Sequence, residues 1–449
     1  MEVPASDLHD NNLVIERKSP TESEFPNGLS PQDDALMRNT SAATDADSYP
    51  EGGKEAWLVT FGSFCAIFAS LGMMNSIGTF QAWISDHELK DTSLEKVSWI
   101  FGFYSFLTFF AGLQWGPVFD AHGPRVLSIP GSILILLMYG TMGLCQEFWQ
   151  FFLVIGVVGG FATGLVFTPA IGSVQHWFHA RRGFATGLAV SGGSVAGIIF
   201  PLILQALLPR IGFAWATRAM GLILLPFLVT ACLLMKSRII DHGRRGPALP
   251  DFTMFNKPMV PQMLIAVFTM ELAFFVPVAY LPSYALDKGM SIKSANALLT
   301  YLNVGSLLGR WLPGYMSDKI GRFNSQILAF ITSIISILGL WLSAGSHEGL
   351  LVATAVLFGL GSGSNISLTP VCLGQLCKTS EYGRFYTSIY TVASFGSLLG
   401  IPVAGTILSG TNNNYLGLIV FGGVSYAVAL VGFITVRIQS VGWRIRVKF

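Results

Sequence analysis

The sequence predicts an all-α integral membrane protein with 12 transmembrane helices in two six-helix, pseudo-symmetric bundles. Three observations predict this fold class. The first is composition, since 52% of the residues are hydrophobic, only 12% are charged and the mean hydropathy is +0.57, whereas about a quarter of the residues of soluble chains are charged. The second is a series of long apolar runs. The third is a polar loop motif that occurs once in each half of the chain.

Each long apolar run is expected to be a helix, because about 20 apolar residues cross a bilayer and lipid cannot satisfy an open backbone. In chain order the twelve runs cover residues 57–82, 97–119, 126–145, 149–172, 183–207, 215–236, 259–284, 295–317, 325–344, 350–374, 385–409 and 415–437. Residues 1–55 form an expected disordered acidic tail, since they lack an apolar run and are rich in Ser, Asp, Asn and Pro.

The repeated loop motif follows the second and the eighth run. Residues 116–125 read Gly-Pro-Val-Phe-Asp-Ala-His-Gly-Pro-Arg, and residues 314–322 read Gly-Tyr-Met-Ser-Asp-Lys-Ile-Gly-Arg. The longest internal gap, residues 237–258, is the expected cytoplasmic linker between an N-terminal bundle, 56–236, and a C-terminal bundle, 259–437. Two such halves place a substrate near the bilayer midplane between them.

Basic residues predict the orientation. Sixteen lie in loops on one side or in the final segment 438–449: Arg125, Arg181, Arg182, Lys236, Arg238, Arg244, Arg245, Lys257, Lys319, Arg322, Lys378, Arg384, Arg437, Arg444, Arg446 and Lys448. Five lie on the other side: Lys90, Lys96, Arg210, Lys288 and Lys293. The positive-inside rule therefore predicts that both termini are cytoplasmic.

Taken together, the loop motifs and the span order resemble the major facilitator superfamily. Within it, the chain is similar to the fungal branch of the monocarboxylate porter family. Residues 50–57 resemble its acidic-Gly-Gly-x-x-Trp segment before the first span, and residues 177–189 resemble the signature that opens its fifth span. The resemblance implies a secondary transporter. The lysine and the aspartate of the animal lactate-proton carriers are replaced by Asn75 and Ser306, whereas their arginine is kept as Arg310.

Arg310 is the first candidate for substrate binding, because an arginine inside a span costs at least ~2.5 kcal/mol and by default faces the bundle interior or a wet cavity. Its planar guanidinium suits a carboxylate. The alternative is a structural ion pair or snorkelling toward the cytoplasm. Further polar groups inside apolar runs are expected to line the same cavity or, alternatively, to hydrogen-bond between helices: Asn75, Tyr104, Tyr301, Asn303 and Asn365.

Glu271 is the only acid well inside an apolar run. Burial favours the protonated form of a carboxyl group, so Glu271 is the candidate proton carrier in place of the missing lysine and aspartate. The alternative is a packing role in which it pairs with Arg310 or with another helix.

The loop motifs are expected to form a gate. Asp120 and Asp318 follow helix ends, and Arg125 and Arg322 are placed to bridge to neighbouring helix ends in cytoplasmic ion pairs that hold the outward-open state. Arg181 and Arg182 are assigned to the same gate. A purely topological role explains the arginines but not the repeated acids and glycines.

The sequence argues against other classes of protein. It has no Gly-x4-Gly-Lys-[Ser/Thr] loop for nucleotide, and neither its seven histidines nor its five cysteines have metal-ligand spacing. We therefore expect no enzyme activity, no cofactor, no metal and no nucleic-acid partner. The expected protein is a monomer in the plasma membrane, with the vacuolar membrane as the alternative, in contact with lipid, a small-molecule substrate and protons.

The sequence leaves two transport functions open. One is a porter for a small organic anion, similar to a monocarboxylate, or for another organic metabolite. The other is an efflux transporter for a secondary metabolite of a biosynthetic gene cluster. A non-transporting membrane sensor is a more distant alternative.

Overall fold

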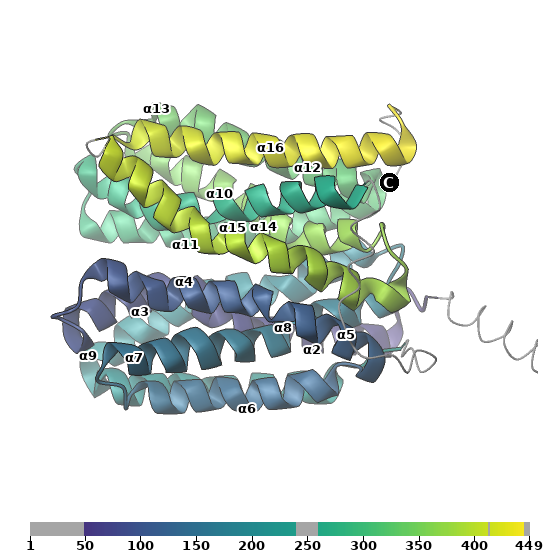
Figure 1. Cartoon of the computed structure of the whole chain (residues 1–449), viewed down its shortest axis with the longest axis horizontal. Coiled ribbons are helices and arrows are strands. Elements are labelled where there is room, and N and C mark those ends of the chain that lie inside the picture. Colours follow the sequence, from purple (N-terminus) through teal and green to yellow (C-terminus); the bar gives the residue numbers. More distant parts are fainter. Residues whose placement is uncertain (1–48, 239–258, 412–413, 444–449) are drawn as a thin grey trace, which may run out of the picture. The chain divides into compact units, whose positions relative to one another are not determined.

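The computed structural model describes residues 49–238, 259–411 and 414–443 of the chain, and within them every regular element is a helix. The predicted tail up to residue 48, most of the predicted linker and the last six residues lie outside the described residues. The helices run roughly parallel or antiparallel to one another (Figure 1). The all-helical fold class predicted from the sequence is confirmed.

Residues 49–238 form six spans. Their elements are α2 (Gly53–Asn75), α3 (Ile77–Trp83), η1 (Ile84–Glu88), α4 (Leu94–Phe110), α5 (Gly112–His122), α6 (Arg125–Met142), α7 (Phe148–Phe151), η2 (Phe152–Gly159), α8 (Gly160–Trp177) and α9 (Arg182–Leu234). The first helix already begins at Gly53, inside the segment that the sequence assigns to the tail. The fifth and sixth spans are joined in α9, where the left-handed φ of 74° at Gly212 marks the turn between them.

The residues after the linker form the other six spans. Their elements are α10 (Met259–Asp287), α11 (Ile292–Ile320), α12 (Arg322–Ile334), η4 (Ile335–Trp341), α13 (Leu342–Ala344), α14 (Glu348–Leu373), η5 (Thr379–Glu381), α15 (Tyr382–Gly410) and α16 (Tyr415–Val441).

The described residues account for the predicted number of spans. Nine helices are long and apolar enough to cross a bilayer, and the bent pair of α4 and α5 makes a tenth. The kinked α9 counts as two spans, and α11 has the length of a span although it carries Arg310 and Asp318. These additions bring the number to twelve.

Apolar side chains remain exposed on the outer faces of the helices. They include Ile133, Trp149, Leu222, Leu233 and Val431, each more than 60% exposed. Water would disfavour such surfaces, whereas lipid tails cover them without cost.

Two sets of helix contacts account for most of the packing between the N-terminal and the C-terminal helices. The helix α11 packs along α9, and α15 packs along α4 and α5. Asp120, Asp318 and Arg310 lie on helices of these two sets.

Candidate functional site

We use the name basic end for the end of the helices that carries the loops with Arg125, Arg181, Arg182, Arg322 and Arg384. Two helices begin at this end: α9, which starts with the fifth span, and α15, which is the eleventh span. The N-terminus of each helix contacts a carboxylate from the other half of the chain. The first backbone N–H groups of a helix have no partner within the helix and carry partial positive charge. A carboxylate at this position is therefore stabilised.

The two carboxylates are Asp318 and Asp120. Asp318 accepts hydrogen bonds from the backbone N–H of Gly183 and of Phe184, both at 2.9 Å. Asp120 accepts from Gly383 at 3.0 Å and from the backbone N–H of Arg384 at 2.8 Å. We call these two pairs of contacts the basic-end gate. They join the N-terminal helices to the C-terminal helices twice, in the same way.

Glycines allow the helices of the gate to approach each other. A methyl group added at Gly383 would lie 2.6 Å from the carbonyl oxygen of Gly116, and one added at Gly183 would lie 2.6 Å from that of Gly314. Carbon atoms do not approach oxygen so closely, so only glycine fits at these crossings. The repeated glycines of the loop motif, at 116 and 314, are explained by this packing.

The predicted gate arginines bind carbonyl groups rather than the two aspartates. Arg182 donates to the carbonyl oxygens of Phe178 at 2.8 Å, of Gln175 at 3.0 Å and, across the two halves, of Gly374 at 3.4 Å. Arg322, 7% exposed, donates to the carbonyl of His179 in the other half.

The other two gate candidates are exposed. Arg125 reaches the carbonyl of Leu233 at 3.5 Å, and the backbone N–H of Arg181 binds Glu51. The side chains of Arg125, Arg182 and Arg322 thus bind backbone carbonyl groups. Among the described residues, the expected ion pairs of these arginines are not formed, and Asp120 and Asp318 accept backbone hydrogen bonds instead.

Residues Tyr49–Glu51, which we call the strap, were not among the predicted site residues. The Glu51 carboxylate accepts the backbone N–H groups of His179, Ala180 and Arg181 at 2.8, 2.6 and 3.1 Å. Tyr49 binds the hydroxyl of Thr379 at 2.5 Å, and its ring lies 5.2 Å from that of His179. The strap therefore joins the loop before α9 to the loop before α15. The acidic-Gly-Gly pattern at residues 51–53 was the signal that pointed to it.

His179 lies close to the strap residues Tyr49 and Glu51 and to the cationic side chains of Arg182 and Arg322. Partial burial, followed by the nearby Arg322 and Arg182, lowers the pKa of its imidazole below the usual 6.5, although Glu51 opposes this. A protonated His179 is therefore disfavoured while the strap and the gate are in contact.

Arg310 lies on α11, farther from the basic end than Asp318, where α11 packs against α9. Its side chain is 1% exposed, and its Nη1 donates a hydrogen bond of 2.5 Å to the carbonyl oxygen of Val190 on α9. Its Nε has no hydrogen-bond partner among the described residues. Next to it, the hydroxyl of Ser194 donates a hydrogen bond of 3.1 Å to the hydroxyl of Ser306.

Two other substrate-binding candidates lie near Arg310. The Asn75 side chain donates a hydrogen bond of 2.7 Å to the carbonyl oxygen of Gly193. A methyl group added at Gly193 would lie 2.9 Å from Arg310 Nη1. A methyl group at Gly197 would lie 2.6 Å from Asn303 Oδ1 and 2.9 Å from Asn75 Cβ. The structure thus brings Arg310, Asn75 and Asn303 together around the glycines of α9.

The remaining substrate-binding candidates lie elsewhere. Tyr104 is fully buried among the N-terminal helices, where its hydroxyl contacts Thr163 at 2.9 Å and the carbonyl of Ser70 at 3.3 Å. Asn365 is buried among the C-terminal helices and binds Gln326 at 2.8 Å and Tyr426 at 3.3 Å. Tyr301 is 42% exposed. The contacts of Tyr104 and Asn365 are those of hydrogen bonds between helices.

Glu271, 6% exposed, accepts a hydrogen bond of 3.1 Å from Ser397 on α15. Neither Glu271 nor Arg310 forms an ion pair within the part of the chain that the structure describes. The alternative role of Glu271 as the ionic partner of Arg310 is therefore not what the structure shows. The two groups have separate partners, one on α15 and one on α9.

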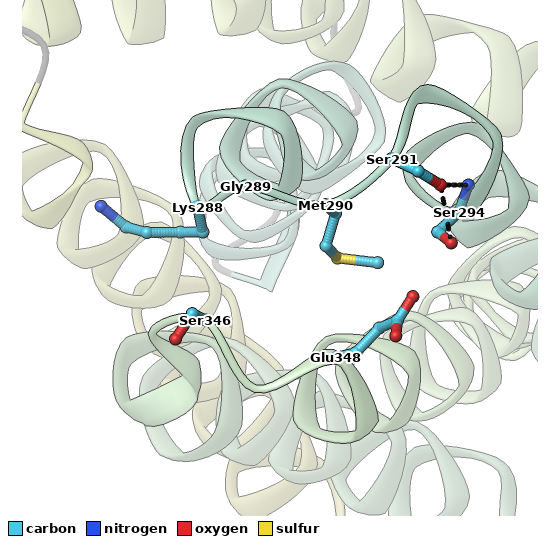
Figure 2. Close-up of a pocket in the computed structure, with 7 residues that line it drawn as sticks. All are labelled: Lys288, Gly289, Met290, Ser291, Ser294, Ser346 and Glu348. Atoms are coloured by element: carbon cyan, nitrogen blue, oxygen red, sulfur yellow. Dashed lines mark hydrogen bonds between the residues drawn. The ribbon is translucent and has the colours of Figure 1, made fainter.

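A surface pocket of about 290 Å³ lies at the end opposite to the basic end. Figure 2 shows Met290 and Glu348 reaching into the space between two loops, whereas Lys288 points away from it. The hydrogen bond to Asp287 raises the pKa of Lys288. Ser291, which caps the start of α11 beside this pocket, lies about 28 Å along the helix axis from Arg310, at 1.5 Å per residue. The pocket is thus separate from the groups described above.

Among the described residues, no three His, Cys, Asp or Glu side chains are grouped so that they could hold a metal ion. The five cysteines are all free thiols.

Comparison with known proteins gives consistent matches. A family model described as Major Facilitator Superfamily matches residues 57–401. The riboflavin transporter MCH5 of Saccharomyces cerevisiae is 33% identical over 90% of this chain and 84% of its own length. The aspyridones efflux protein apdF of Emericella nidulans is 33% identical over 87% of this chain and 78% of its own. Among solved structures, FucP in the outward conformation has a TM-score of 0.68 at 16% identity, covering 85% of this chain and 99% of that one.

Proposed function

The chain belongs to the Major Facilitator Superfamily, and on this basis we propose that it is a secondary transporter whose substrate is a small organic anion bound at Arg310. Membership of the superfamily and its transporter relatives make it a multi-pass membrane transporter. The substrate, the direction of transport and the coupling ion are the proposed part.

Arg310 is the single observation that carries the choice of an anion. Its guanidinium is buried, makes one hydrogen bond to a backbone carbonyl, and leaves Nε without a partner among the described residues. A buried cation without a counter-ion is costly, because desolvation is not offset by attraction to a negative charge. An anionic substrate supplies the missing charge, and Asn75 and Asn303 supply polar contacts beside it.

We propose alternating access around this point. With the basic end on the cytoplasmic side, as the distribution of basic residues predicts, the gate contacts of Asp120 and Asp318 close the cytoplasmic entrance. Opening breaks four backbone-to-carboxylate hydrogen bonds, together with the strap and the two arginine contacts that cross the halves. Glu271, buried and bonded to Ser397 on the helix that Asp120 holds, is the proposed proton carrier.

A second candidate is efflux of a secondary metabolite. Its support is the name of the relative apdF, an efflux protein at 33% identity over most of both chains. The relative MCH5 is a riboflavin transporter, so similarity of this degree accompanies different substrates. We place the protein in the plasma membrane as a monomer, and imaging of a fluorescent C-terminal fusion would separate this location from the vacuolar membrane.

Uptake into proteoliposomes tests the proposed substrate class. The purified full-length chain should take up labelled benzoate above empty liposomes when the external pH is lower than the internal pH. Arg310→Gln should lose most of this uptake, and Arg310→Lys should keep part of it. Arg210→Gln, which removes an exposed arginine at the opposite end, is the matched control.

Equal uptake by the Arg310→Gln protein and the unchanged protein would contradict the role of Arg310. Direction is tested separately in the source organism. A strain that lacks the gene should retain a metabolite inside the cell if the protein exports it, and should leave it in the medium if the protein imports it.

A further inference from the structure

Three tyrosines follow one face of α15 at four-residue spacing. Residues four apart lie above one another on a helix, and the rings of Tyr382 and Tyr386 are 5.6 Å apart, while those of Tyr386 and Tyr390 are 4.5 Å apart. All three side chains are buried. They form a ladder of rings along the helix.

The ladder faces the other half of the chain. The ring of Tyr390 lies 5.6 Å from that of Phe109 on α4, and Phe109 lies 6.0 Å from Phe167 on α8. We call Tyr386, Tyr390, Phe109 and Phe167 the aromatic cluster. It lies where α15 contacts the N-terminal helices, which is one of the two sets of helix contacts that the basic-end gate holds together.

The aromatic cluster and Arg310 lie at the same depth. Tyr390 follows Arg384, whose N–H binds Asp120, by six residues on α15, and Val190, which accepts from Arg310, follows Phe184 by six residues on α9. Six residues of helix rise about 9 Å. A substrate between the two halves at this depth therefore meets a guanidinium on one side and a group of aromatic rings on the other.

Opening of the basic end is expected to be energetically unfavourable at the aromatic cluster, because it separates rings that are in contact. The rings of Tyr390 and Phe109 belong to different halves, so separation of the halves exposes both ring faces to water. Aromatic faces stack favourably on other flat rings, beyond the gain from area alone. A flat substrate ring inserted between them replaces the contact that opening breaks.

From this geometry we propose that the substrate of this transporter carries a flat conjugated ring next to its anionic group, and that Tyr390 and Phe109 select the ring. The proposal rests on the proposed function at Arg310 and adds to it the chemical class of the rest of the substrate. Burial of apolar surface alone does not favour the flat ring, because a saturated ring of the same skeleton has at least as much apolar surface to bury.

The test uses three probes with the detergent-purified full-length chain and isothermal titration calorimetry. The probes are 2-naphthoate, its fully saturated decahydro analogue and the neutral 2-naphthalenemethanol. We expect 2-naphthoate to bind about 2- to 10-fold more tightly than the saturated acid, the range given by aromatic pairing. It should also bind more tightly than the neutral alcohol because of Arg310.

Variants separate the two parts. Tyr390→Leu should remove the preference for the flat ring and keep the preference for the acid over the alcohol. Tyr390→Phe, which keeps the ring, should keep both, and Arg310→Gln should remove only the preference for the acid. An unfolding midpoint measured for each variant confirms that it is folded.

Each remaining outcome decides a specific point. Equal or tighter binding of the saturated acid would overturn the ring proposal and leave the anion proposal standing. Equal binding of acid and alcohol with a kept ring preference would overturn the anion proposal alone. No binding of any probe at millimolar concentration would overturn both.

Discussion

Asp120 and Asp318 make the same contact in the two halves of the chain. Each lies near the end of a helix and accepts the backbone N–H groups of two consecutive residues at the start of a helix from the other half, at 2.8 to 3.0 Å. The repeated loop motif thus encodes a pair of equivalent helix caps that act between the halves. An N-terminal cap of this kind stabilises a helix by about 0.5–2 kcal/mol, and here it also holds the halves together.

The first prediction concerns these caps. Asp318→Ala should raise the ratio of open to closed basic end by about 5-fold, since about 1 kcal/mol of cap energy is lost. The readout is the rate at which a maleimide alkylates Cys372, which is fully buried in α14 near the gate, in a chain whose other four cysteines are serine.

Asp318→Asn is the matched control, because an asparagine oxygen caps a helix nearly as well. In Asp318→Asn, Cys372 should be alkylated at a rate between those in the unchanged chain and in Asp318→Ala. Asp120→Ala should behave as Asp318→Ala does. Identical alkylation rates for all of these chains would show that the caps do not hold the basic end closed.

Much of the fold follows from the sequence because lipid imposes simple rules. A span must be a helix of about 20 apolar residues, so twelve runs predict the spans even where residues 97–119 divide into α4 and α5. The ends of helices are less predictable. The kink at Gly212 replaces an expected loop of several residues, because a single residue with positive φ is enough to turn the chain.

The second prediction concerns the strap. Tyr49→Phe removes the hydroxyl that binds Thr379 and keeps the ring beside His179. Either Tyr49→Phe or Thr379→Val should speed alkylation of Cys372. The closed state loses one hydrogen bond, which contributes about 0.5–1.5 kcal/mol to its stability, and the fraction of open molecules rises accordingly.

The double variant Tyr49→Phe with Thr379→Val supplies the test of contact. The two residues share one hydrogen bond, so the effects of the single changes should not add. Fully additive effects would mean that the two side chains act independently, and the strap would then not join the two loops.

The candidate site was predictable only in part. Arg310, Asp120 and Asp318 are charges in or beside apolar runs, and their cost makes them visible in a sequence. Glu51 and Tyr390 are not visible in this way. Glu51 lies in a polar segment, and its role depends on three backbone N–H groups about 130 residues away in the chain. Tyr390 is one aromatic residue among many, and only the packing of α15 against α4 gives it a partner in the other half.

The third prediction is a pH dependence of closure. Burial and the nearby Arg322 lower the pKa of His179 in the closed basic end. When the end opens, His179 is exposed to water and Arg322 moves away with the other half, so the pKa rises back toward about 6.5 and the open state binds protons more readily. Closure should therefore be unaffected above about pH 7 and weaken progressively as the pH falls below about 6.5.

Alkylation of Cys372 between pH 7.5 and 5.5, corrected for the pH dependence of a small free thiol, measures this effect. His179→Gln should flatten the corrected profile below pH 6.5. A profile that is the same with and without His179 would assign the dependence to another group.

The fourth prediction concerns Glu271. If its carboxyl carries the coupling proton, Glu271→Gln should abolish the stimulation of benzoate uptake by an inward proton gradient while exchange of internal for external benzoate continues. Ser397→Ala is the companion variant, since it removes the one hydrogen bond to Glu271 but keeps the carboxyl group. It should shift the pH of half-maximal uptake without abolishing it. Unchanged stimulation in Glu271→Gln would exclude Glu271 as the proton carrier.

The fifth prediction uses the glycine crossings. A methyl group at residue 383 would lie 2.6 Å from both the carbonyl oxygen of Gly116 and Asp120 Oδ1, so Gly383→Ala must push α15 away from α5. Overpacking costs about 1–3 kcal/mol, and here it acts only on the closed state. The basic end should therefore open, with alkylation of Cys372 faster than in any of the cap variants.

Gly140→Ala in α6 separates this effect from the general effect of alanine in a helix. No atom lies within 4 Å of the methyl group it would add, and alanine favours a helix over glycine by up to about 1 kcal/mol. Its unfolding midpoint should not fall, and its alkylation rate should not change. If Gly383→Ala alkylated no faster than Gly140→Ala, the contact of α15 with α5 would not be the one that opens, and closure would depend on the pair α9 and α11 alone.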